Sequence, residues 1–261
     1  MTKALFFDID GTLVSFETHD IPASTIEALT RARARGHRIF IATGRPAVLI
    51  NNLGPLQQRG LIDGYITMNG SYCFVGDEII YKNPIPHEDV CTIVNYCAEH
   101  HIACAVVSEH DICVCQANEN IRFIFHEFLK TDALRESTPE AAIREPVFQL
   151  TPFVSTEQEA ELLPHSPHSI AARWHPAFAD VTAVGNTKQR GIDEIIRHFG
   201  IDLKDTIAFG DGGNDVSMLR HAAIGVAMGN AVPEVQREAD YVTSSVDEDG
   251  IALAMKHFGL I

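Results

Sequence analysis

Short apolar runs that stop abruptly at a polar, glycine-containing segment constrain the fold of this chain most. The first run, Ala4–Phe7, is followed directly by the pentapeptide Asp8–Thr12 (DIDGT), and a second run, His37–Ala42, is followed by Thr43–Arg45 (TGR). An uninterrupted apolar run of this length is typical of a strand buried on both faces, as in a parallel sheet. The pattern therefore predicts a parallel sheet with polar loops at the carboxyl ends of its strands.

The first polar segment brings two carboxylates together. Residues two apart in an extended chain point the same way, so Asp8 and Asp10 are expected side by side where the strand ends. Gly11 permits the sharp exit that follows. Two adjacent carboxylates repel unless a cation or a shared proton relieves them. An ordinary Asp-Gly turn is the alternative, but the position after a buried strand favours a metal site with one carboxylate free to react.

The first 82 residues alternate strands with helices. Spacing of apolar residues predicts helices over 23–35 and 46–58 and a third strand over 64–68. Residues 71–75 and 78–82 flank a Gly-Asp pair and predict a short hairpin. This order of elements predicts a parallel sheet with right-handed crossovers.

The character of the sequence changes between Pro84 and Val181, where helices mix with alternating strands and no chemical motif is found. The strand–helix alternation then resumes. We predict a doubly wound parallel-sheet α/β core of residues 1–82 and 181–261, interrupted by an inserted α+β domain of residues 83–180. The later core elements are predicted as helices over 188–199 and 250–258, strands over 206–209 and 224–227, and a helix from residue 214.

The composition is acidic, with a formal net charge of −15 over 261 residues. Non-specific nucleic-acid binding depends on basic patches, so no nucleic-acid partner is expected. An anionic substrate would need a cation, a basic side chain or a helix N-terminus nearby. An 18-residue apolar run and a cleavable leader pattern are both missing from the sequence, so we expect no membrane partner and a soluble, cytoplasmic protein. The sequence does not predict an oligomeric state.

All six cysteines lie between Cys73 and Cys115, and no pair has the Cys-x-x-Cys spacing of a zinc site. We interpret them as small, mostly buried thiols rather than as metal or redox groups.

Two basic side chains lie at the ends of predicted elements: Arg45 follows a strand, and Lys188 begins a helix. The hydroxyl of Thr43 could donate to a phosphate oxygen, and Arg45 could make a bidentate contact with an anion. Lys188 stands at a predicted helix start, where a cation opposes the helix dipole. An anion or a carboxylate that faces Lys188 would explain this position, and a solvated surface lysine is the alternative.

The segment Gly210–Asp215 (GDGGND) follows another apolar run. Its glycines match neither the dinucleotide nor the P-loop spacing, and its functional side chains are acidic. Acidic side chains hold a cation, and Mg²⁺ is commonly held by one or two carboxylates together with substrate phosphate. All the polar segments fall where ligands bind in open α/β sheets. The sequence therefore predicts a Mg²⁺ site that acts on a phosphate group.

The order Asp-x-Asp-Gly-Thr, Thr-Gly-Arg, Lys and Gly-Asp-x-x-Asn-Asp resembles the haloacid dehalogenase superfamily. In particular, it is similar to the Cof-type sugar phosphatases that carry a type IIB cap. The resemblance covers both halves of the core by motif, and residues 83–180 by position and length. It implies that these residues form a cap domain that determines substrate specificity.

The resemblance also implies residue roles. Asp8 would be the nucleophile that becomes an aspartyl-phosphate, and Asp10 the general acid and then the general base. Thr43 and Lys188 would hold the transferring phosphoryl group. Mg²⁺ would be bound by the carboxylates of Asp8 and Asp211 and by the backbone carbonyl of Asp10. Further roles near the metal, the phosphate or the substrate are expected for Gly44, Arg45, Asn69, Gly70, Trp174, His175, Asp180, Asn214 and Asp215.

These expectations favour a Mg²⁺-dependent phosphatase that hydrolyses small phosphorylated metabolites, most simply hexose or pentose monophosphates. A receiver-type signalling protein would also carry a phosphorylated Asp, but it has no need for Asp10 or for the insertion. A mutase-like phosphoryl-transfer enzyme remains an alternative. A dehalogenase is disfavoured because attack on carbon needs no Mg²⁺, and a non-catalytic binding protein would not need both Asp8 and Asp10.

Overall fold

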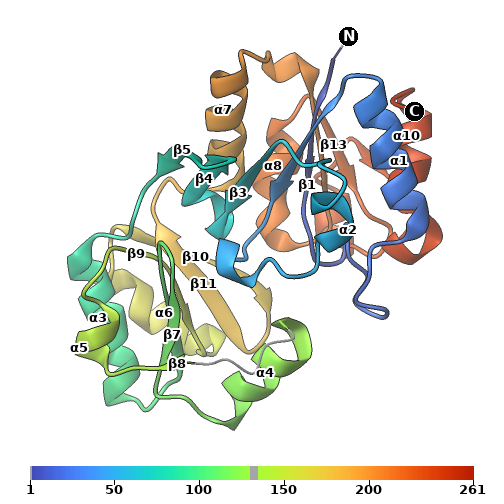
Figure 1. The fold of residues 1–261 in the computed structure, drawn as a ribbon. Coiled ribbons are helices and arrows are strands. Elements are labelled where there is room, and N and C mark those ends of the chain that lie inside the picture. Colours follow the sequence, from blue (N-terminus) through green and yellow to red (C-terminus); the bar gives the residue numbers. More distant parts are fainter. Residues whose placement is uncertain (1, 130–134) are drawn as a thin grey trace. The chain divides into compact units, whose positions relative to one another are not determined.

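The computed structural model describes residues 2–129 and 135–261 (Figure 1). The chain divides into two compact units. The first comprises Met1–Arg45, Ile50–Lys82 and Thr187–Ile261, and the second comprises Pro46–Leu49 and Asn83–Asn186. The second unit extends beyond the expected limit at residue 180, because its last strand continues to Ala183 and pairs within that unit.

In the part of the chain that the structure describes, the first unit contains an eight-stranded sheet in the order β14-β13-β12-β1-β2-β3-β4-β5. The strands from β14 to β3 are parallel, and the hairpin β4–β5 continues the sheet antiparallel. The doubly wound α/β prediction is confirmed. The strands are β1 (Ala4–Phe7), β2 (Arg38–Ala42), β3 (Gly64–Thr67), β4 (Tyr72–Val75), β5 (Glu78–Lys82), β12 (Thr206–Gly210), β13 (Ile224–Ala227) and β14 (Tyr241–Val242).

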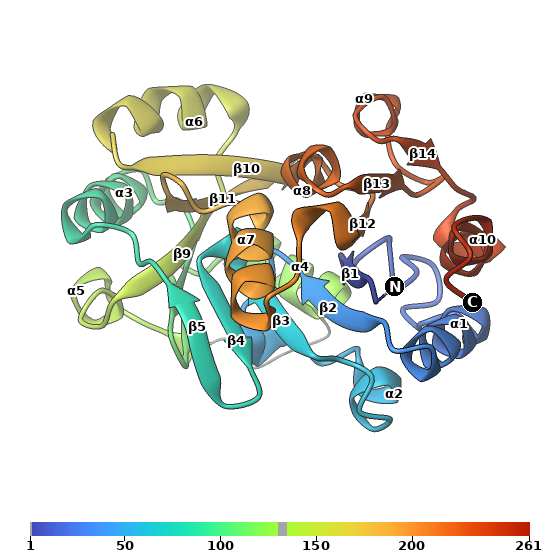
Figure 2. The ribbon, with the colours of Figure 1, turned by 90° about the horizontal axis from the view of Figure 1, so that it is seen from above.

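Helices cover both faces of this sheet (Figure 2). On one face, α1 (Ala23–Ala34) and α10 (Gly250–His257) pack against alternate residues of the central strands. On the other face, α7 (Lys188–Phe199), α8 (Val216–His221) and α9 (Pro233–Gln236) do the same. The fully apolar strands are thus buried on both sides, as the sequence predicts.

Strand β1 lies between β12 and β2, with Phe7 opposite both Phe209 and Ile41. The loops that follow these three strands therefore leave the sheet at the same edge. This register places the polar segments after residues 7, 42 and 210 beside one another.

Two predicted elements are wrong in detail. The expected helix over 46–58 is a 3₁₀ turn, Ala47–Leu49, and a separate single turn, α2 (Gly54–Gln57). Pro55 lacks a backbone N–H and stands in the first turn of α2, so it begins a new helix instead of continuing an earlier one. The expected helix from residue 214 is a 3₁₀ turn, Gly213–Asp215, before α8 begins.

The second unit contains a mixed sheet in the order β10-β11-β9-β6-β7-β8 among its described residues. Helices α3 (His87–Glu99), α5 (Pro139–Ala142) and α6 (Thr156–Leu162) cover one face, and α4 (Glu119–Leu129) covers part of the other. The strands are β6 (Cys104–Ser108), β7 (Ile112–Cys115), β8 (Arg135–Glu136), β9 (Val147–Pro152), β10 (Ser169–His175) and β11 (Phe178–Ala183).

The cysteines are free thiols, and all except Cys91 are buried. Burial raises the pKa of the Cys115 thiol to about 11, which keeps it protonated and unreactive at neutral pH. The interpretation of these residues as buried thiols is confirmed for five of the six positions.

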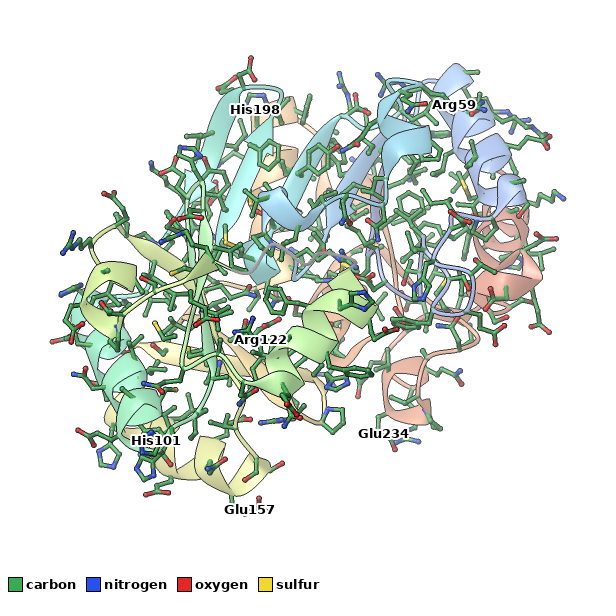
Figure 3. All side chains as sticks on the ribbon, turned by 60° about the horizontal axis from the view of Figure 1, so that its bottom comes forward. Arg59, His101, Arg122, Glu157, His198 and Glu234 are labelled. Carbon is green, nitrogen blue, oxygen red and sulfur yellow. The ribbon has the colours of Figure 1, made fainter. Side chains whose placement is uncertain are left out.

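Charged side chains such as Arg59, Glu157 and Glu234 point outward from the ribbon (Figure 3). Within the described ranges, the structure contains no helix that is both long enough and apolar enough to span a bilayer.

Candidate active site

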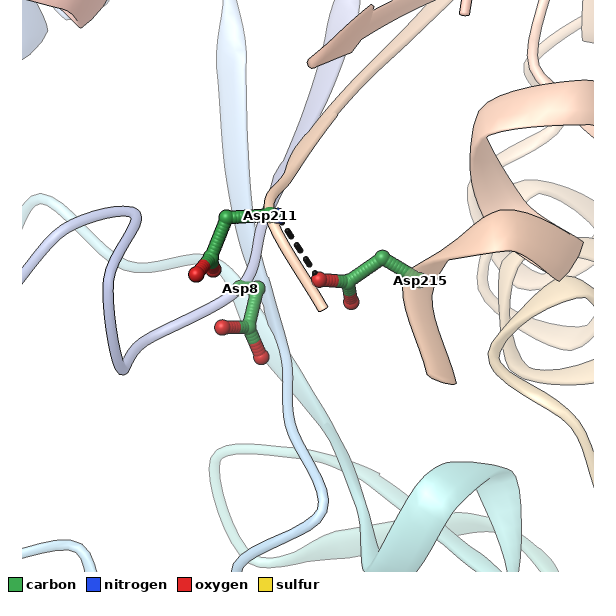
Figure 4. A group of neighbouring side chains, drawn as sticks. All are labelled: Asp8, Asp211 and Asp215. Atoms are coloured by element: carbon green, nitrogen blue, oxygen red, sulfur yellow. Dashed lines mark hydrogen bonds between the residues drawn. The ribbon is translucent and has the colours of Figure 1, made fainter. Parts of the chain in front are cut away.

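Three carboxylates gather at the carboxyl edge of the core sheet. Asp8 follows β1, Asp211 follows β12, and Asp215 ends the 3₁₀ turn beyond it (Figure 4). Each offers an oxygen atom, and these atoms lie within 4.8 Å of one another. The pairing of β1 with β12 brings Asp8 and Asp211 together across about two hundred residues of sequence.

Lys188 neutralises part of this charge. It is the first residue of α7 and is fully buried. Its Nζ donates to Oδ1 of Asp8 at 2.6 Å and to Oδ1 of Asp215 at 2.5 Å. Burial alone would lower the pKa of Lys188, but the charges of Asp215 and Asp8 raise it above its ordinary value. The lysine is therefore a permanent cation, which explains its position against the helix dipole.

Asp215 shapes the loop that carries Asp211. Its Oδ2 accepts a hydrogen bond from the backbone N–H of Asp211 at 2.9 Å (Figure 4). The same oxygen accepts from the N–H of Gly212 at 2.8 Å, and Oδ1 accepts from Lys188. A Cβ at Gly210 would lie 2.5 Å from the Cβ of Asp215, so only glycine fits there. Both oxygens of Asp215 are therefore engaged, one with the loop and the other with the lysine.

The protonation of the other two carboxylates reflects their surroundings. Burial, followed by the charge of Asp215, raises the pKa of Asp8 well above its ordinary value, although the charge of Lys188 opposes this shift. Burial and the charge of Asp215 also raise the pKa of Asp211 to about 7, while a hydrogen bond from Thr12 opposes the rise. Both carboxylates would hold their charge more readily beside a cation.

The arrangement fits Mg²⁺. Its donors are carboxylate oxygens, which this ion prefers. Oδ2 of Asp8 has no hydrogen-bond donor among the described residues, so it remains available as a ligand or as a nucleophile. Gly11 keeps the space beside Asp211 open, since a Cβ there would lie only 2.2 Å from Oδ2 of Asp211. Asp8 and Asp211 are therefore the carboxylates that would hold the ion.

Asp10 stands apart from the three-carboxylate cluster. Arg45 holds its carboxylate in a bidentate contact, Nε to Oδ2 at 2.7 Å and Nη2 to Oδ1 at 2.7 Å. Arg45 is buried, whereas the Asp10 side chain is a quarter exposed. We expected Arg45 to meet a substrate anion, but in this structure its guanidinium binds Asp10. This contact engages both carboxylate oxygens of the expected general acid.

Thr43 is buried beside these groups at the end of β2. Its Oγ1 accepts a hydrogen bond from the backbone N–H of Arg45 at 3.0 Å, which leaves the hydroxyl proton for another acceptor. Gly44 joins the two residues in the same turn. Both side chains of this segment are therefore held next to the Asp8 loop by the pairing of β1 with β2.

A left-handed turn follows β3. Met68, Asn69 and Gly70 have φ values of 49°, 52° and 95°. Such a run is strained for Met and Asn and is typical of functional sites. Oδ1 of Asn69 accepts from Nδ2 of Asn214 at 3.0 Å, and the Nδ2 of Asn69 is buried without a hydrogen-bond acceptor in the described ranges. A Cβ at Gly70 would lie 2.1 Å from the carbonyl oxygen of Thr187, so this turn packs against the start of α7.

Sequence reasoning missed two residues around Asp211. Oγ1 of Thr12 donates to Oδ1 of Asp211 at 2.9 Å. Asn230 lies near Oδ2 of the same carboxylate, with its Nδ2 at 3.4 Å. Thr12 belongs to the quoted DIDGT motif, and Asn230 follows the apolar strand β13, so the rule that polar loops follow buried strands could have found both.

The remaining expected site residues, Trp174, His175 and Asp180, belong to the second unit. The side chain of Trp174 lies outside the described part of the structure. His175 stacks on Phe178 in the turn between β10 and β11, and its Nδ1 accepts from the backbone N–H of Ala177. The position of His175 is thus explained by the turn itself.

Asp180 belongs to a buried polar row that the sequence did not reveal. It accepts a hydrogen bond from Oγ1 of Thr151 at 2.8 Å, and Thr151 contacts Gln149 in turn. Alternation along β9 and β11, with Val181 opposite Leu150, places these three side chains on the face away from α3. Oε1 of Gln149 is buried with no donor in the part of the second unit that the structure describes.

The fold and site together define a doubly wound α/β hydrolase with an acidic, lysine-containing centre at the strand ends. The chain belongs to the haloacid dehalogenase-like hydrolase family, whose sequence profile matches residues 5–255. The resemblance that the motifs suggest is thereby confirmed.

Individual relatives are similar over the whole chain. The solved structure of BT4131, described as a sugar phosphatase of subclass IIB of this superfamily, is 62% identical, covers 100% of both chains and superposes with a TM-score of 0.97. The phosphatase BT1666 of Bacteroides thetaiotaomicron is 36% identical, covering 100% of this chain and 96% of its own, with a TM-score of 0.90. YkrA of Bacillus subtilis (strain 168), provisionally named a phosphatase, is 36% identical over 100% of this chain and 99% of its own length. The prediction of a phosphatase, a phosphoric monoester hydrolase, is confirmed.

Proposed function

We propose that this protein is a Mg²⁺-dependent phosphatase of small phosphorylated metabolites, with hexose or pentose monophosphates as its main substrates. The observation that carries the proposal is the buried cluster of Asp8, Asp211 and Asp215 around the ammonium group of Lys188. The substrate class is supported by BT4131, a sugar phosphatase with 62% identity over its full length.

In the first step, Oδ2 of Asp8 attacks the phosphorus atom, and the bond between phosphorus and the sugar oxygen breaks. Lys188 holds Oδ1 of the nucleophile and so fixes the direction of the free oxygen. Asp10 gives a proton to the departing oxygen. The product of this step is an aspartyl-phosphate on Asp8 and a free sugar hydroxyl.

In the second step, Asp10 takes a proton from water, and the resulting hydroxide attacks phosphorus. The bond from phosphorus to Asp8 breaks, which releases inorganic phosphate and restores the carboxylate. The hydroxyl of Thr43, the amide of Asn214 and the ammonium group of Lys188 would contact the equatorial oxygens. Bound Mg²⁺ would neutralise the charge that develops on these oxygens.

The contact between Arg45 and Asp10 adds a condition to this scheme. The bidentate guanidinium occupies both carboxylate oxygens of Asp10, so neither oxygen is free to give a proton to the leaving oxygen of the first step. We therefore propose that the substrate's anionic group draws Arg45 away from Asp10, which can then carry the proton for the leaving oxygen.

For the leaving group, we propose that residues 83–180 act as a substrate-specificity cap. The polar row of Gln149, Thr151 and Asp180 supports this role. A buried acceptor with no donor, next to a carboxylate and a hydroxyl, is suited to the hydroxyl groups of a sugar. We also propose substrate contacts for Trp174 and His175, and a phosphate or substrate contact for Asn69 and Gly70.

The test is the release of inorganic phosphate from a panel of hexose and pentose monophosphates. The wild-type protein would be compared with Asp8→Asn and Asp10→Asn, each with Mg²⁺ and with EDTA. We expect the wild-type protein to release phosphate with Mg²⁺ but not with EDTA, and we expect neither variant to release it. Transfer of the phosphoryl group to a second sugar would favour the mutase alternative, and a long-lived phosphoprotein would favour a receiver.

A further inference from the structure

Asn230 uses its whole side-chain amide to join three loops, although the residue as a whole is exposed. Its Nδ2 donates to the carbonyl oxygen of Gly11 at 2.8 Å and lies 3.4 Å from Oδ2 of Asp211. Its Oδ1 accepts from the backbone N–H of Val246 at 3.0 Å. The two N–H bonds of one amide nitrogen thus connect the loop of the nucleophile with the loop of Asp211.

The position of Asn230 is fixed by its neighbours. A Cβ at Gly229 would lie 2.6 Å from the backbone nitrogen of Ser245, and one at Gly250 would lie 2.2 Å from the carbonyl oxygen of Ser244. The backbone of this loop therefore packs directly on the loop before α10. The N–H of Met228 also donates to the carbonyl of Gly210 at 3.0 Å. A side chain on so rigid a base can orient its partners.

Donors face both oxygens of Asp211. Thr12 donates to Oδ1 at 2.9 Å, and Asn230 approaches Oδ2 at the longer distance. Donors on both sides limit the rotation of the carboxylate about its terminal bond. The lone pairs of Asp211 that accept no hydrogen bond then point in a fixed direction. A ligand to a small octahedral ion requires such a fixed orientation.

We propose that Asn230 is a positioning residue for Mg²⁺: by joining Gly11 to Asp211, it holds the Asp211 carboxylate in the orientation that binds the ion. This inference rests on the proposed function, because it takes Asp211 as a metal ligand. It assigns to Asn230 no contact with the substrate and no proton transfer.

The experiment measures Mg²⁺ binding to the substrate-free protein by isothermal titration calorimetry. Asn230→Ala removes both donors and is expected to raise the dissociation constant about tenfold or more, in the range found for groups that orient metal ligands. At saturating Mg²⁺, kcat should return to within about twofold of the wild-type value, since the ligands themselves remain.

Gln236 offers a matched control. Its Nε2 donates to the carbonyls of Gly229 and Ala231 in the same loop, and no bond joins it to Asp211 or Gly11 among the described residues. Gln236→Ala should leave the dissociation constant for Mg²⁺ unchanged. If Asn230→Ala does not fold, Asn230→Gln keeps the amide but displaces it by one methylene, and it should weaken Mg²⁺ binding in the same direction.

A purely structural role would lower the melting temperature of the Asn230 variants without changing their affinity for Mg²⁺. Equal affinities in wild type, Asn230→Ala and Gln236→Ala would therefore overturn the inference while leaving the proposed function intact. A wild-type protein that binds no Mg²⁺ would overturn both.

Discussion

The ammonium group of Lys188 lies between two carboxylates, 2.6 Å from Oδ1 of Asp8 and 2.5 Å from Oδ1 of Asp215. Lys188 begins a helix of the second half of the core, and Asp8 follows the first strand of the chain. The ion pair therefore couples the two core segments that the insertion separates. It also leaves Oδ2 as the oxygen of Asp8 that has no hydrogen-bond donor among the described residues.

Replacing Lys188 by Met should destabilise the protein and abolish phosphatase activity. Met fills a similar volume but leaves Asp8 and Asp215 buried without their cation. Removing one partner of a buried pair typically costs about 3–5 kcal/mol. Urea unfolding at pH 7, compared with Lys204→Met at an exposed surface ion pair, measures this cost. An unfolding free energy equal to that of the control would show that the buried pair is not needed for stability.

Metal-free protein should lose stability as the pH rises from about 4 to about 7. The folded pKa of Asp211 is raised to about 7 by burial and by Asp215, whereas an unfolded Asp titrates near 4. Between these values the folded state binds the extra proton, so stability falls with rising pH and levels off above about 7. The raised pKa of Asp8 acts in the same direction.

Melting temperatures measured across this pH range in EDTA test the prediction. Mg²⁺ should remove most of the decrease in melting temperature with rising pH, because it stabilises the charged carboxylates of the folded protein. Asp211→Asn should reduce the decline in EDTA. A melting temperature that rises from pH 4 to pH 7 without metal would contradict the account of these carboxylates.

A methyl group at Gly11 should displace Asp211 and weaken Mg²⁺ binding. Gly11 has a φ of 83°, and a Cβ there would lie 2.2 Å from Oδ2 of Asp211. Gly185 has nearly the same φ, 89°, but no atom within 4 Å of its added Cβ. Gly185→Ala therefore reports the backbone strain alone. Mg²⁺ titration should show a clear loss for Gly11→Ala only, and a similar loss in both variants would exclude the steric explanation.

Replacing Arg45 by Ala should raise KM for a sugar monophosphate by about tenfold or more, because one charge-assisted hydrogen bond to an anion contributes about 1.5–3 kcal/mol. Arg45→Lys keeps the charge but not the bidentate geometry and should be intermediate. Steady-state kinetics at saturating Mg²⁺ measure both variants. An unchanged KM in Arg45→Ala would show that Arg45 does not bind the substrate and contacts only Asp10.

Local patterns predicted the parts of the fold that depend on buried strands. The runs before Asp8 and Asp211 indicated strands, and their order indicated a parallel sheet, so the meeting of these two acids followed from topology. The position of Lys188 at a helix start left two interpretations, an anionic partner or a solvated surface lysine, and the structure shows two carboxylates at its ammonium group. The prediction of one helix over 46–58 was wrong because it relied on the spacing of apolar residues and gave too little weight to Pro55, which begins a separate helix.

Other features depend on register, which the sequence did not reveal. The row of Gln149, Thr151 and Asp180 forms only because β9 pairs with β11 in one particular alignment. The contact of Asn230 with Asp211 likewise needs β13 to lie next to β12. The bond between Arg45 and Asp10 depends on side-chain conformation, and no spacing rule predicts it.

Covalent labelling of Asp8 tests the central claim most directly. The protein would be mixed with a sugar monophosphate labelled in its phosphate, with Mg²⁺ present, and quenched in acid during turnover. We predict label on the wild-type protein, in the peptide that contains Asp8, and none on Asp8→Asn. Phosphate release without labelled protein, or label that persists in Asp8→Asn, would contradict an aspartyl-phosphate mechanism at this residue.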